Sequence, residues 1–543
     1  MTIELDENWR SCGATRAKGC AFLGDSCLRA DDIAATLDAC QTEAAWLVVI
    51  SSLNGSFAAV SERGDTVWAA VDHLRSIPLF YGLQRNEFIL SDRAERVRVA
   101  VGDHAQSPEA SREFLLVGYV TGSETLFPNL KQIHAGGALS FIAKPTPKLQ
   151  CSRYFGWRHR DPWPADGDAL IERLHQVHVQ VARRLIASLD GRQAVLPLSG
   201  GYDSRLIALM LKEQGYDNVV CYTYGLPGNW EARISEAMAR HLGFRWEFIP
   251  YSGEKWREWG ASADYQRYCA TAGNLTAIPH VQDWPAFHEL KKRGAIDDHS
   301  IVVPGHSGDF VAGSHIPHWF IERDAITRDQ LLQTIFDAHY SLWDWPNDAD
   351  LKHDLIRRID AVGGALKGGS ASDAADQVEF WDMNERQAKF ICNSVRVYDF
   401  FGHDWRLPLF DQSLLDFWSR VPVELRVGRR LYFDYVKRYQ DLPVLTPNQD
   451  RSRLADAVLA LVNRCGLRGL AKSVQYQLRR LKWESTYEQC TEPPLAWFTL
   501  IDRELFRKTY TGKQTLHAYF ARLGSQGYFG PDSGVTGKGS FSR

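Results

Sequence analysis

Residues 198–205 read Leu-Ser-Gly-Gly-Tyr-Asp-Ser-Arg, and this short run constrains the chain more than any other feature. It follows the apolar run 194–198 and opens a helical pattern over 204–212. A strand, a glycine-rich turn and a helix N-terminus form an anion cradle, because backbone N–H groups and the helix dipole favour negative charge there. The glycines let the backbone approach an oxyanion, and Asp203 adds a carboxylate able to hold Mg²⁺ against a phosphate.

This run is not a Walker loop, because it lacks the Gly-Lys-Ser/Thr element. It resembles the pyrophosphate loop of the N-type ATP pyrophosphatases, which split ATP between the α and β phosphates and activate a carbonyl or carboxylate as an adenylate. The resemblance implies one set of pyrophosphate-binding residues: Ser199, Gly200, Gly201, Asp203 and Ser204. The alternative is a surface Gly-Gly turn. Pro197 removes a ladder donor from the predicted central strand, so a bulge is expected there.

The size and composition limit the classes of protein. A chain of 543 residues predicts two or three domains, and 45% hydrophobic with 24% charged residues is typical of soluble globular proteins. The net charge of −3 gives no general attraction to nucleic acid or anionic membrane. The N-terminus is acidic, unlike a signal peptide, and no apolar run approaches the ~20 residues that span a bilayer. Ten cysteines without Cys-x-x-Cys or zinc spacing favour a cytoplasmic protein.

The first predicted domain covers residues 1–160 and is rich in short alternating segments. Strands are expected at 46–50, 56–60, 66–71, 78–81 and 87–90, with a helix near 111–118. Three stretches, 53–58, 72–81 and 118–127, resemble the glutaminase domain of asparagine synthetases. That resemblance implies an antiparallel αββα fold of the Ntn-hydrolase type.

The first domain departs from that family where the glutaminase chemistry resides. The family uses an N-terminal cysteine whose own amine is the base, whereas position 2 is Thr2 here. The glutamine-holding segments are absent, and the residues before Leu53 are expected to be too few for the family's first strands. Cys12 and Cys20 have no free amine and are interpreted as ordinary buried thiols. Thr2 as a nucleophile is disfavoured because no apolar strand follows it, so we predict a degenerate glutaminase.

The second predicted domain covers residues 161–440 and alternates helices and strands. After the linker-like stretch 157–164, a helix over 168–188 is followed by strands at 219–224 and 244–249 around the helix Trp230–Leu242. This alternation predicts a parallel sheet with its ligand at the carboxyl ends of the strands. It resembles the synthetase domain of asparagine synthetases, an adenine nucleotide α hydrolase fold. The resemblance implies that Leu198 and Tyr224 bracket the adenosine of ATP.

A second ATP-site stretch at 302–313 is similar to that family's Ser-Gly-Glu-Gly-x-Asp loop. Pro304 and Gly305 correspond to residues that line the adenylate, and Asp309 corresponds to the second metal-binding carboxylate. Asp203 and Asp309 together suit Mg²⁺, which takes one or two protein carboxylates. His306 replaces the family's glutamate. It is either a base toward the incoming amine or a loop histidine bonded to its own backbone.

Two further stretches bear on the substrate. In the stretch 397–411, three residues match the family's Arg-x-Pro-x-x-Asp: Arg406, Pro408 and Asp411. Arg406 is either a substrate clamp or a structural ion-pair partner, and we favour the structural role. The family's catalytic lysine is not evident after 441–443. The polar, aromatic loop 268–284 is expected to approach the acyl substrate, with Asn274, His280 and Gln282 as candidate specificity residues. Packing of that loop by its own side chains is the alternative.

The predicted tail, 441–543, has no counterpart in those synthetases and is expected to be helical. Residues 451–483 carry eight Lys or Arg against one acidic residue. Such a face is either solvated or meets an anionic partner, such as a nucleotide-linked sugar or a lipid head group. The sequence leaves open whether the chain forms a homodimer.

The favoured function is an ATP- and Mg²⁺-dependent amide ligase that joins a small-molecule carboxylate to ammonia or an amine through an acyl-adenylate. Aspartate with ammonia is the default pair by resemblance. Alternatives of the same chemistry are intramolecular cyclisation, as in β-lactam synthetases and lasso-peptide cyclases, and amidation of uronic acids in surface polysaccharides. A tRNA modifier of the thiolase or lysidine type is disfavoured by the neutral charge and the missing Cys-x-x-Cys. A non-catalytic nucleotide-binding regulator is the rival of another class.

Overall fold

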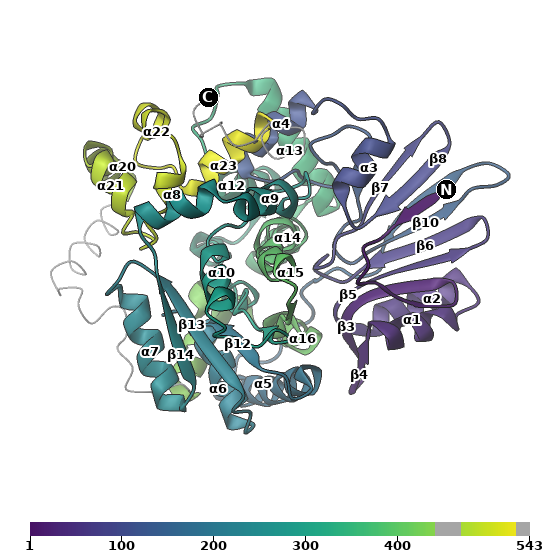
Figure 1. The fold of residues 1–543 in the computed structure, drawn as a ribbon, viewed down its shortest axis with the longest axis horizontal. Coiled ribbons are helices and arrows are strands. Elements are labelled where there is room, and N and C mark those ends of the chain that lie inside the picture. The colour runs from purple at the N-terminus through teal and green to yellow at the C-terminus, as the bar shows by residue number, and fades with distance from the viewer. Residues whose placement is uncertain (440–467, 528–543) are drawn as a thin grey trace.

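The computed structural model of the chain describes residues 1–439 and 468–527 (Figure 1). This described part contains three larger sheets and one two-stranded sheet, β16 (Ile326–Thr327) with β17 (Gly368–Gly369). Two of the larger sheets belong to the N-terminal residues and the third to the middle of the chain (Figure 1). None of the described helices combines the length and the apolar character that a membrane span needs.

The larger N-terminal sheet has seven strands in the order β11-β10-β6-β5-β3-β2, with β4 paired to β3, and all its neighbours are antiparallel. Its strands are β2 (Arg10–Cys12), β3 (Thr15–Leu23), β4 (Ser26–Arg29), β5 (Leu53–Arg63), β6 (Thr66–Val71), β10 (Gly137–Ile142) and β11 (Lys148–Arg153). The smaller sheet has the order β1-β8-β7-β9. Its strands are β1 (Thr2–Glu4), β7 (Phe80–Gln84), β8 (Glu87–Ser91) and β9 (Lys131–Gln132).

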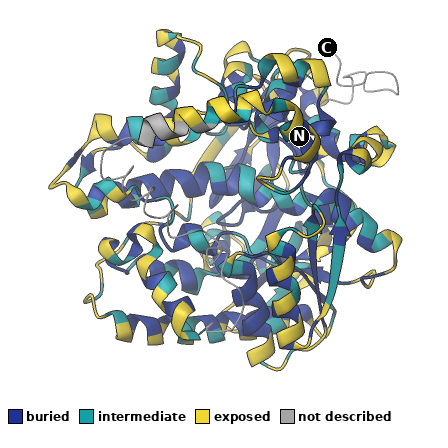
Figure 2. Cartoon of the chain, turned by 90° about the vertical axis from the view of Figure 1, so that its left-hand side faces the viewer, coloured by how far each residue is buried: buried dark blue, intermediate teal, exposed yellow. Residues whose placement is uncertain are grey.

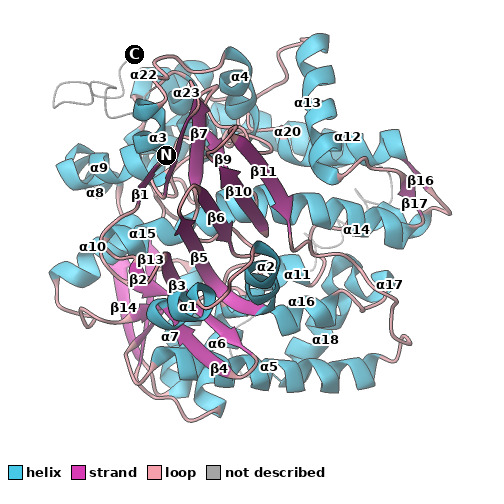
Figure 3. Cartoon of the chain, turned by 90° about the vertical axis from the view of Figure 1, so that its right-hand side faces the viewer, coloured by secondary structure: helices cyan, strands magenta, loops and turns pink. Residues whose placement is uncertain are grey.

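These two sheets pack face to face between two layers of helix. Successive residues of a strand point to opposite faces, so Ala58 and Val60 of β5 face the smaller sheet while Phe57 and Ala59 face outward. Helices α1 (Ala30–Asp38) and α2 (Glu43–Ser52) cover that outer face (Figure 3). On the other side α3 (Ala94–Ala100) packs on β7 and β8, followed by α4 (Pro108–Val117). The predicted αββα architecture is confirmed.

The segment 46–50, predicted as a strand, is instead the middle of α2. The Thr42 hydroxyl accepts a hydrogen bond from the Ala45 N–H at 3.2 Å and caps the helix N-terminus. Trp46 and Ile50, four residues apart, are fully buried on one face, whereas the Val48 side chain is 65% exposed. A run of five apolar residues does not distinguish a buried strand from one face of a helix, and here the cap decides.

The N-terminal residues also correct the sequence interpretation. Residues 2–29 form four strands, so the stretch before Leu53 is long enough for the first strands of the sandwich. Thr2 itself begins β1 and pairs in parallel with Ile89 of β8. No apolar strand follows Thr2, as expected, but a short polar strand begins there, because three residues paired to an existing sheet edge need no apolar run of their own.

The third sheet is the predicted parallel sheet, with five strands in the order β14-β13-β12-β15-β18. Its strands are β12 (Ala194–Pro197), β13 (Val219–Gly225), β14 (Arg245–Pro250), β15 (Ile301–Val302) and β18 (Asp404–Trp405). The helices α5 (Gly167–Leu189), α6 (Tyr202–Glu213) and α7 (Trp230–Leu242) pack side by side, and α10 (Trp284–Lys292) lies against β14. The central strands are buried on both faces, as the dark blue residues in Figure 2 indicate. This arrangement turns the loops after β12, β13 and β15 toward one edge of the sheet.

Pro197 is accommodated at the end of β12 without the expected bulge. The register with β13 runs unbroken from Ala194 to Pro197. The Ala194 and Leu198 N–H groups donate toward β13, so the alternate position 197 faces β15. Pairing with β15 ends at Val195, whose carbonyl accepts the Val303 N–H at 2.9 Å. The donor that proline lacks therefore has no ladder partner to lose.

Helices fill the rest of the described chain. After β14 and up to residue 439, the other α-helices are α8 (Gly253–Ala261), α9 (Ala263–Ala272), α11 (Gly308–Val311), α12 (Arg328–His339), α13 (Ala349–Gly363), α14 (Ala371–Asp382), α15 (Arg396–Phe400), α16 (Gln412–Trp418), α17 (Val423–Arg426) and α18 (Arg430–Tyr439). A π-helix, Met383–Ile391, follows α14 directly. The linker-like stretch is packed rather than free, since Trp157 is buried and its indole N–H donates to the Leu415 carbonyl at 2.8 Å.

The described tail is helical, as expected. It contains α20 (Arg468–Leu481), α21 (Trp483–Gln489), α22 (Arg503–Thr509) and α23 (Leu516–Ser525), and α23 packs against α4 (Figure 1). Most of the basic stretch 451–483 lies outside the described residues, and its anionic partner stays a prediction.

Candidate active site

The loop after β12 places its hydroxyl groups at the start of α6. The Ser199 and Ser204 Oγ atoms are 3.1 Å apart, and the Gly201 N–H donates to Ser199 Oγ at 3.1 Å. Gly201 is the N-terminal cap of α6. A Cβ at Gly200 would lie 2.2 Å from the Trp230 ring, so only glycine allows α7 to pack this closely on the turn. The result is a tight turn with a helix N-terminus, which favours an anion.

A second loop, from β15 into α11, packs directly on the first. A Cβ at Gly305 would lie 2.7 Å from the Ser204 backbone nitrogen, and one at Gly308 would lie 2.9 Å from the Asp203 carboxyl carbon. The loop is held by Ser307, which has a left-handed φ of 94° and donates its hydroxyl to Gln387 Oε1 at 2.8 Å. Two glycines thus bring the two predicted ATP loops into contact.

Two carboxylates meet where these loops touch. Asp203 Oδ1 accepts the Tyr432 hydroxyl at 2.6 Å, and Asp203 Oδ2 accepts the Asp309 backbone N–H at 3.0 Å. Burial, and next the negative charge of Asp309, raise the pKa of Asp203 to about 6, against the two hydrogen bonds. A divalent cation between these oxygens and bound phosphates would relieve that repulsion, and Mg²⁺ needs no more than two protein carboxylates. In the described chain no group of three His, Cys, Asp or Glu side chains is placed to hold a metal ion.

The two loops form one side of a cleft of about 460 Å³ at the carboxyl edge of the parallel sheet. Its lining residues come from both loops and from the opposite side: Pro197, Ser199, Gly201, Tyr202, Asp203, Ser204, Tyr224, His280, Gln282, Asp283, Pro304, Gly305, His306, Asp309, Ser394, Tyr398 and Arg429. Pockets for single small ligands usually measure about 300–1,000 Å³. The cleft therefore has the size of a pocket for a small ligand.

The asparagine synthase family matches residues 176–438, a stretch that contains the whole cleft. Residues 176–438 form an asparagine synthase domain. The resemblance inferred from the two loops is confirmed by this match. No curated protein matches the chain.

Two solved structures show a remote likeness. The allosteric regulatory enzyme of purine biosynthesis is 12% identical with a TM-score of 0.19, covering 43% of this chain and 60% of its own. Glutamine phosphoribosylpyrophosphate amidotransferase from B. subtilis, complexed with ADP and GMP, is 10% identical with a TM-score of 0.20, covering 55% of this chain and 63% of its own. The chain thus spans less than two thirds of either protein, and TM-scores this low do not inform the fold.

Most of the predicted site residues line the cleft of the asparagine synthase domain, and four do not. Leu198 is buried behind the loop, and Gly200 faces Trp230. Asn274 lies in a turn with φ 46° and donates its N–H to the Thr271 carbonyl at 3.1 Å, away from the cleft. The side-chain amide of Gln282, by contrast, donates to the Tyr224 hydroxyl at 3.0 Å and lines it.

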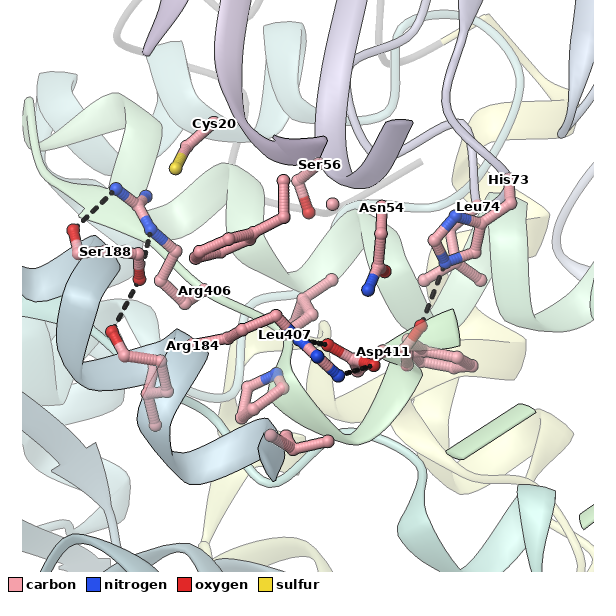
Figure 4. Close-up of a pocket in the computed structure, with 16 residues that line it drawn as sticks. Cys20, Asn54, Ser56, His73, Leu74, Arg184, Ser188, Arg406, Leu407 and Asp411 are labelled. Carbon is pink, nitrogen blue, oxygen red and sulfur yellow. Dashed lines mark hydrogen bonds and ion pairs between the residues drawn. The ribbon is translucent and has the colours of Figure 1, made fainter. Parts of the chain in front are cut away.

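Arg406 is the fourth and is a correction to the predicted substrate residues. Its guanidinium donates to the Ser188 hydroxyl at 3.2 Å, the Ser188 carbonyl at 3.3 Å and the Trp405 carbonyl at 2.8 Å. It lies in a different pocket (Figure 4), where Asp411 is paired with Arg184 at 2.6 Å. Arg406 thus has a structural role, as we favoured. Its hydrogen-bond partners are two backbone carbonyls and a serine hydroxyl, however, and not the carboxylate of an ion pair.

The His306 side chain matches neither predicted role fully. Its Nε2 is 3.1 Å from Ser394 Oγ rather than bonded to its own backbone, and its Nδ1 is buried without a partner. Burial lowers the pKa of His306 to about 4, so it does not titrate near neutrality. The imidazole is therefore neutral and available to accept a proton. Burial also lowers the pKa of His280 well below its usual value.

The sequence analysis missed six cleft residues as site residues, and two of them, Asp283 and Arg429, bear on the charge of the cleft. Asp283 directly follows Gln282 and gives up its capping role at α10, because its Oδ2 accepts the Tyr398 and Tyr222 hydroxyls at 2.6 and 2.7 Å. Its Oδ1 is buried without a partner, and burial raises the pKa of Asp283 to about 6. Its place within the loop 268–284, which the sequence analysis singled out, could have indicated it.

Arg429 is the second of these two residues, and it brings positive charge to the phosphate side. It lines the cleft with a left-handed φ of 60°, and its charge lowers the pKa of Asp203. It forms no ion pair with any carboxylate of residues 1–439 or 468–527, and its guanidinium stacks 4.7 Å from the Phe433 ring centroid. The segment expected to carry a catalytic lysine, after 441–443, lies outside the described residues.

The first domain is hydrogen-bonded to a loop that leads into the cleft. Backbone hydrogen bonds join its segment 118–126 to the loop 275–278: Val120 N–H to Thr276 O at 2.9 Å, Leu126 N–H to Leu275 O at 3.0 Å and Ile278 N–H to Gly118 O at 2.8 Å. That loop leads into His280, Gln282 and Asp283. The first domain thus helps to fix the loop that supplies these three residues to the cleft.

The π-helix Met383–Ile391 makes a second connection. Lys389 Nζ donates to the carbonyls of Val120 at 2.8 Å and Gly122 at 2.6 Å. On the same helix Gln387 holds Ser307, and the Phe390 ring centroid is 4.3 Å from that of His280. π-helical turns often occur at functional sites, and this one contacts both the first domain and the cleft.

Proposed function

We propose that this chain is an ATP-dependent carbon–nitrogen ligase that activates a carboxylate as an acyl-adenylate and transfers the acyl group to ammonia or an amine. The observation that carries the proposal is the single cleft in which the Ser199–Ser204 turn, Asp203, the Asp309 loop and the loop 280–283 meet. The match to the asparagine synthase family supports the same chemistry.

The first step forms the adenylate. A substrate carboxylate oxygen attacks the α-phosphorus of ATP, the bond between that phosphorus and the bridging oxygen breaks, and pyrophosphate leaves. The hydroxyls of Ser199 and Ser204 and the N-terminus of α6 bind the leaving phosphates. Arg429 offsets their charge from the opposite side. Asp203 and Asp309 are the residues that would hold Mg²⁺, which when bound neutralises phosphate charge.

The second step forms the amide. The nitrogen nucleophile attacks the acyl carbon, the bond to AMP breaks, and the nitrogen loses a proton. Neutral His306, with a free Nδ1, accepts that proton in this proposal. Thr2 stands where the glutaminases have cysteine, so the chain takes free ammonia or an amine rather than glutamine.

Aspartate is the first carboxylate to test, as the family suggests. Uronic acids are the second candidate, because they too offer a carboxylate that ATP can adenylate. Amine-bearing acids that cyclise on themselves form the third class. A regulator that only binds nucleotide would release no AMP.

The test measures pyrophosphate and AMP release from Mg·ATP with each acid, using ammonium or glutamine. The expected result is release that depends on the acid and on ammonium but not on glutamine. Asp203→Asn and Asp309→Asn should lower AMP formation by on the order of 10²-fold or more. Asp217→Asn, at an exposed residue paired with Lys212, is the matched control. Nucleotide binding without AMP from any acid would favour the regulator.

A further inference from the structure

Two cysteines of the first domain lie side by side across a hairpin. Cys20 is on β3 and Cys27 on β4, in a register that pairs Phe22 with Cys27 and Cys20 with Arg29. Their Sγ atoms are 3.6 Å apart, within hydrogen-bonding distance for thiols. The nine described cysteines are all free thiols. Cys20 and Cys27 are seven positions apart in sequence and belong to the same hairpin. Their sulfur atoms are therefore already close together in the folded domain.

Cys20 also lines a pocket between the two domains (Figure 4). The pocket measures only about 60 Å³, and Figure 4 shows Cys20, Asn54, Ser56 and His73 on the first-domain side facing Arg184, Ser188 and Arg406. Apolar side chains, among them Phe22, Leu185 and Leu407, complete the lining, so the pocket suits only a very small molecule. Cys27 is partly exposed at the hairpin's end, while Cys20 is buried except toward this pocket.

The charges around Cys20 favour its thiolate. The hydrogen bond from Cys27 lowers the pKa of Cys20 most, and the positive charges of Arg406 and Arg192 add to it, against burial and the charge of Asp404. The pKa of Cys20 falls to about 6, whereas donation of that hydrogen bond raises the pKa of Cys27. A thiolate beside a protonated thiol is the reactive arrangement for oxidation.

We propose that Cys20 and Cys27 form an oxidisable dithiol at the seam between the domains, with a small hydroperoxide as its oxidant and Cys20 as the attacking sulfur. The Cys20 thiolate attacks one peroxide oxygen, the O–O bond breaks, and the departing hydroxide takes a proton to leave as water. Cys20 is then a sulfenic acid. Cys27 attacks the Cys20 sulfur, the S–O bond breaks, and a second water leaves. Two thiols and one hydrogen peroxide thus give one disulfide and two waters.

The sequence around the pair makes the product easy to measure. Trypsin cleaves after Lys18 and Arg29 and nowhere between, so both cysteines lie in one peptide, residues 19–29. Full-length protein is treated with one equivalent of hydrogen peroxide, alkylated with N-ethylmaleimide, and digested. The expected peptide lacks both alkyl groups and two hydrogen atoms. Exposed Cys151, which has no second cysteine beside it in the described structure, is the matched thiol and should form no intramolecular disulfide.

Two variants keep the proposal falsifiable. In Cys27→Ser, Cys20 should stop at the sulfenic acid and be labelled by dimedone. In Cys20→Ser, Cys27 should react at least tenfold more slowly. Iodoacetamide rates against pH should give Cys20 an inflection near 6. Oxidation of Cys151 with full alkylation of Cys20 and Cys27 overturns the proposal, as does equal reactivity of Cys20 in native and guanidinium-unfolded protein. AMP release is not needed for any of these measurements.

Discussion

Lys389 and Glu385 form an ion pair 2.6 Å long on the π-helix, and both side chains are out of contact with solvent. Burial lowers the pKa of Lys389 and raises that of Glu385, while each opposes the shift in the other. The pair is completed from the first domain, because Gly122 donates its N–H to Glu385 and its carbonyl accepts from Lys389. The pair therefore depends on both domains.

Removing one member of this pair should destabilise the whole chain. Lys389→Met leaves a buried carboxylate without its cation, and the expected loss in the free energy of unfolding is about 3–5 kcal/mol. The double variant Glu385→Gln with Lys389→Met removes both charges and should lose less. Chemical unfolding monitored by tryptophan fluorescence measures both. Equal losses for the single and double variants would mean that the ion pair itself does not matter.

We expect the positive charge of Arg429 to contribute more to catalysis than that of the adjacent residue, Arg430. Arg429→Ala removes the cation that lines the cleft, and we expect pyrophosphate formation to fall by on the order of 10²-fold with little change in thermal stability. Arg430→Ala is the matched control, since that residue is exposed and outside the cleft. Comparable losses in both variants would assign the effect to general surface charge.

The contact between the two ATP loops can be tested at one glycine. Gly305→Ala places a Cβ 2.7 Å from a backbone nitrogen, which cannot turn aside as a side chain can, so the loops must separate. The expected outcome is at least a tenfold rise in the Kd for ATP, measured by calorimetry. Gly167→Ala at the start of α5 meets no atom within 4 Å and should leave the Kd unchanged.

Asp283 should give the folded state a recognisable dependence on pH. Burial raises its pKa to about 6 from the ordinary value of 3.8, so the folded state holds its proton more tightly than the unfolded state. Stability from this group is full below pH 4 and is lost as the pH rises through 6, by up to about 3 kcal/mol. In Asp283→Asn that part of the pH dependence should vanish. Unfolding curves of both proteins at pH 4.5 and 7 measure the difference, and parallel curves would contradict it.

Local sequence motifs predicted the two loops that contain Ser199, Asp203 and Asp309. The other residues of the cleft are brought there by long-range packing, which no local motif predicts. Ser199, Asp203 and Asp309 belong to short runs whose turn chemistry is local, and the structure places all three in the cleft. Arg429 arrives there from a bend before α18, more than a hundred residues further on, and no local pattern connects it to the loops. The missed helix at 46–50 has the same origin, because burial of Trp46 and Ile50 depends on a sheet that the run itself does not contain.

The hydrogen bonds from Val120, Leu126 and Ile278 affect how the gene can evolve, because they join the two domains. A gene shortened to encode only the ATP-binding half would produce a protein whose 275–278 backbone had lost its partners. Selection for the ligase reaction would then preserve the N-terminal part of the gene whether or not that part encodes a reaction of its own. In this chain, the sequence of the first domain is constrained by the backbone of the second.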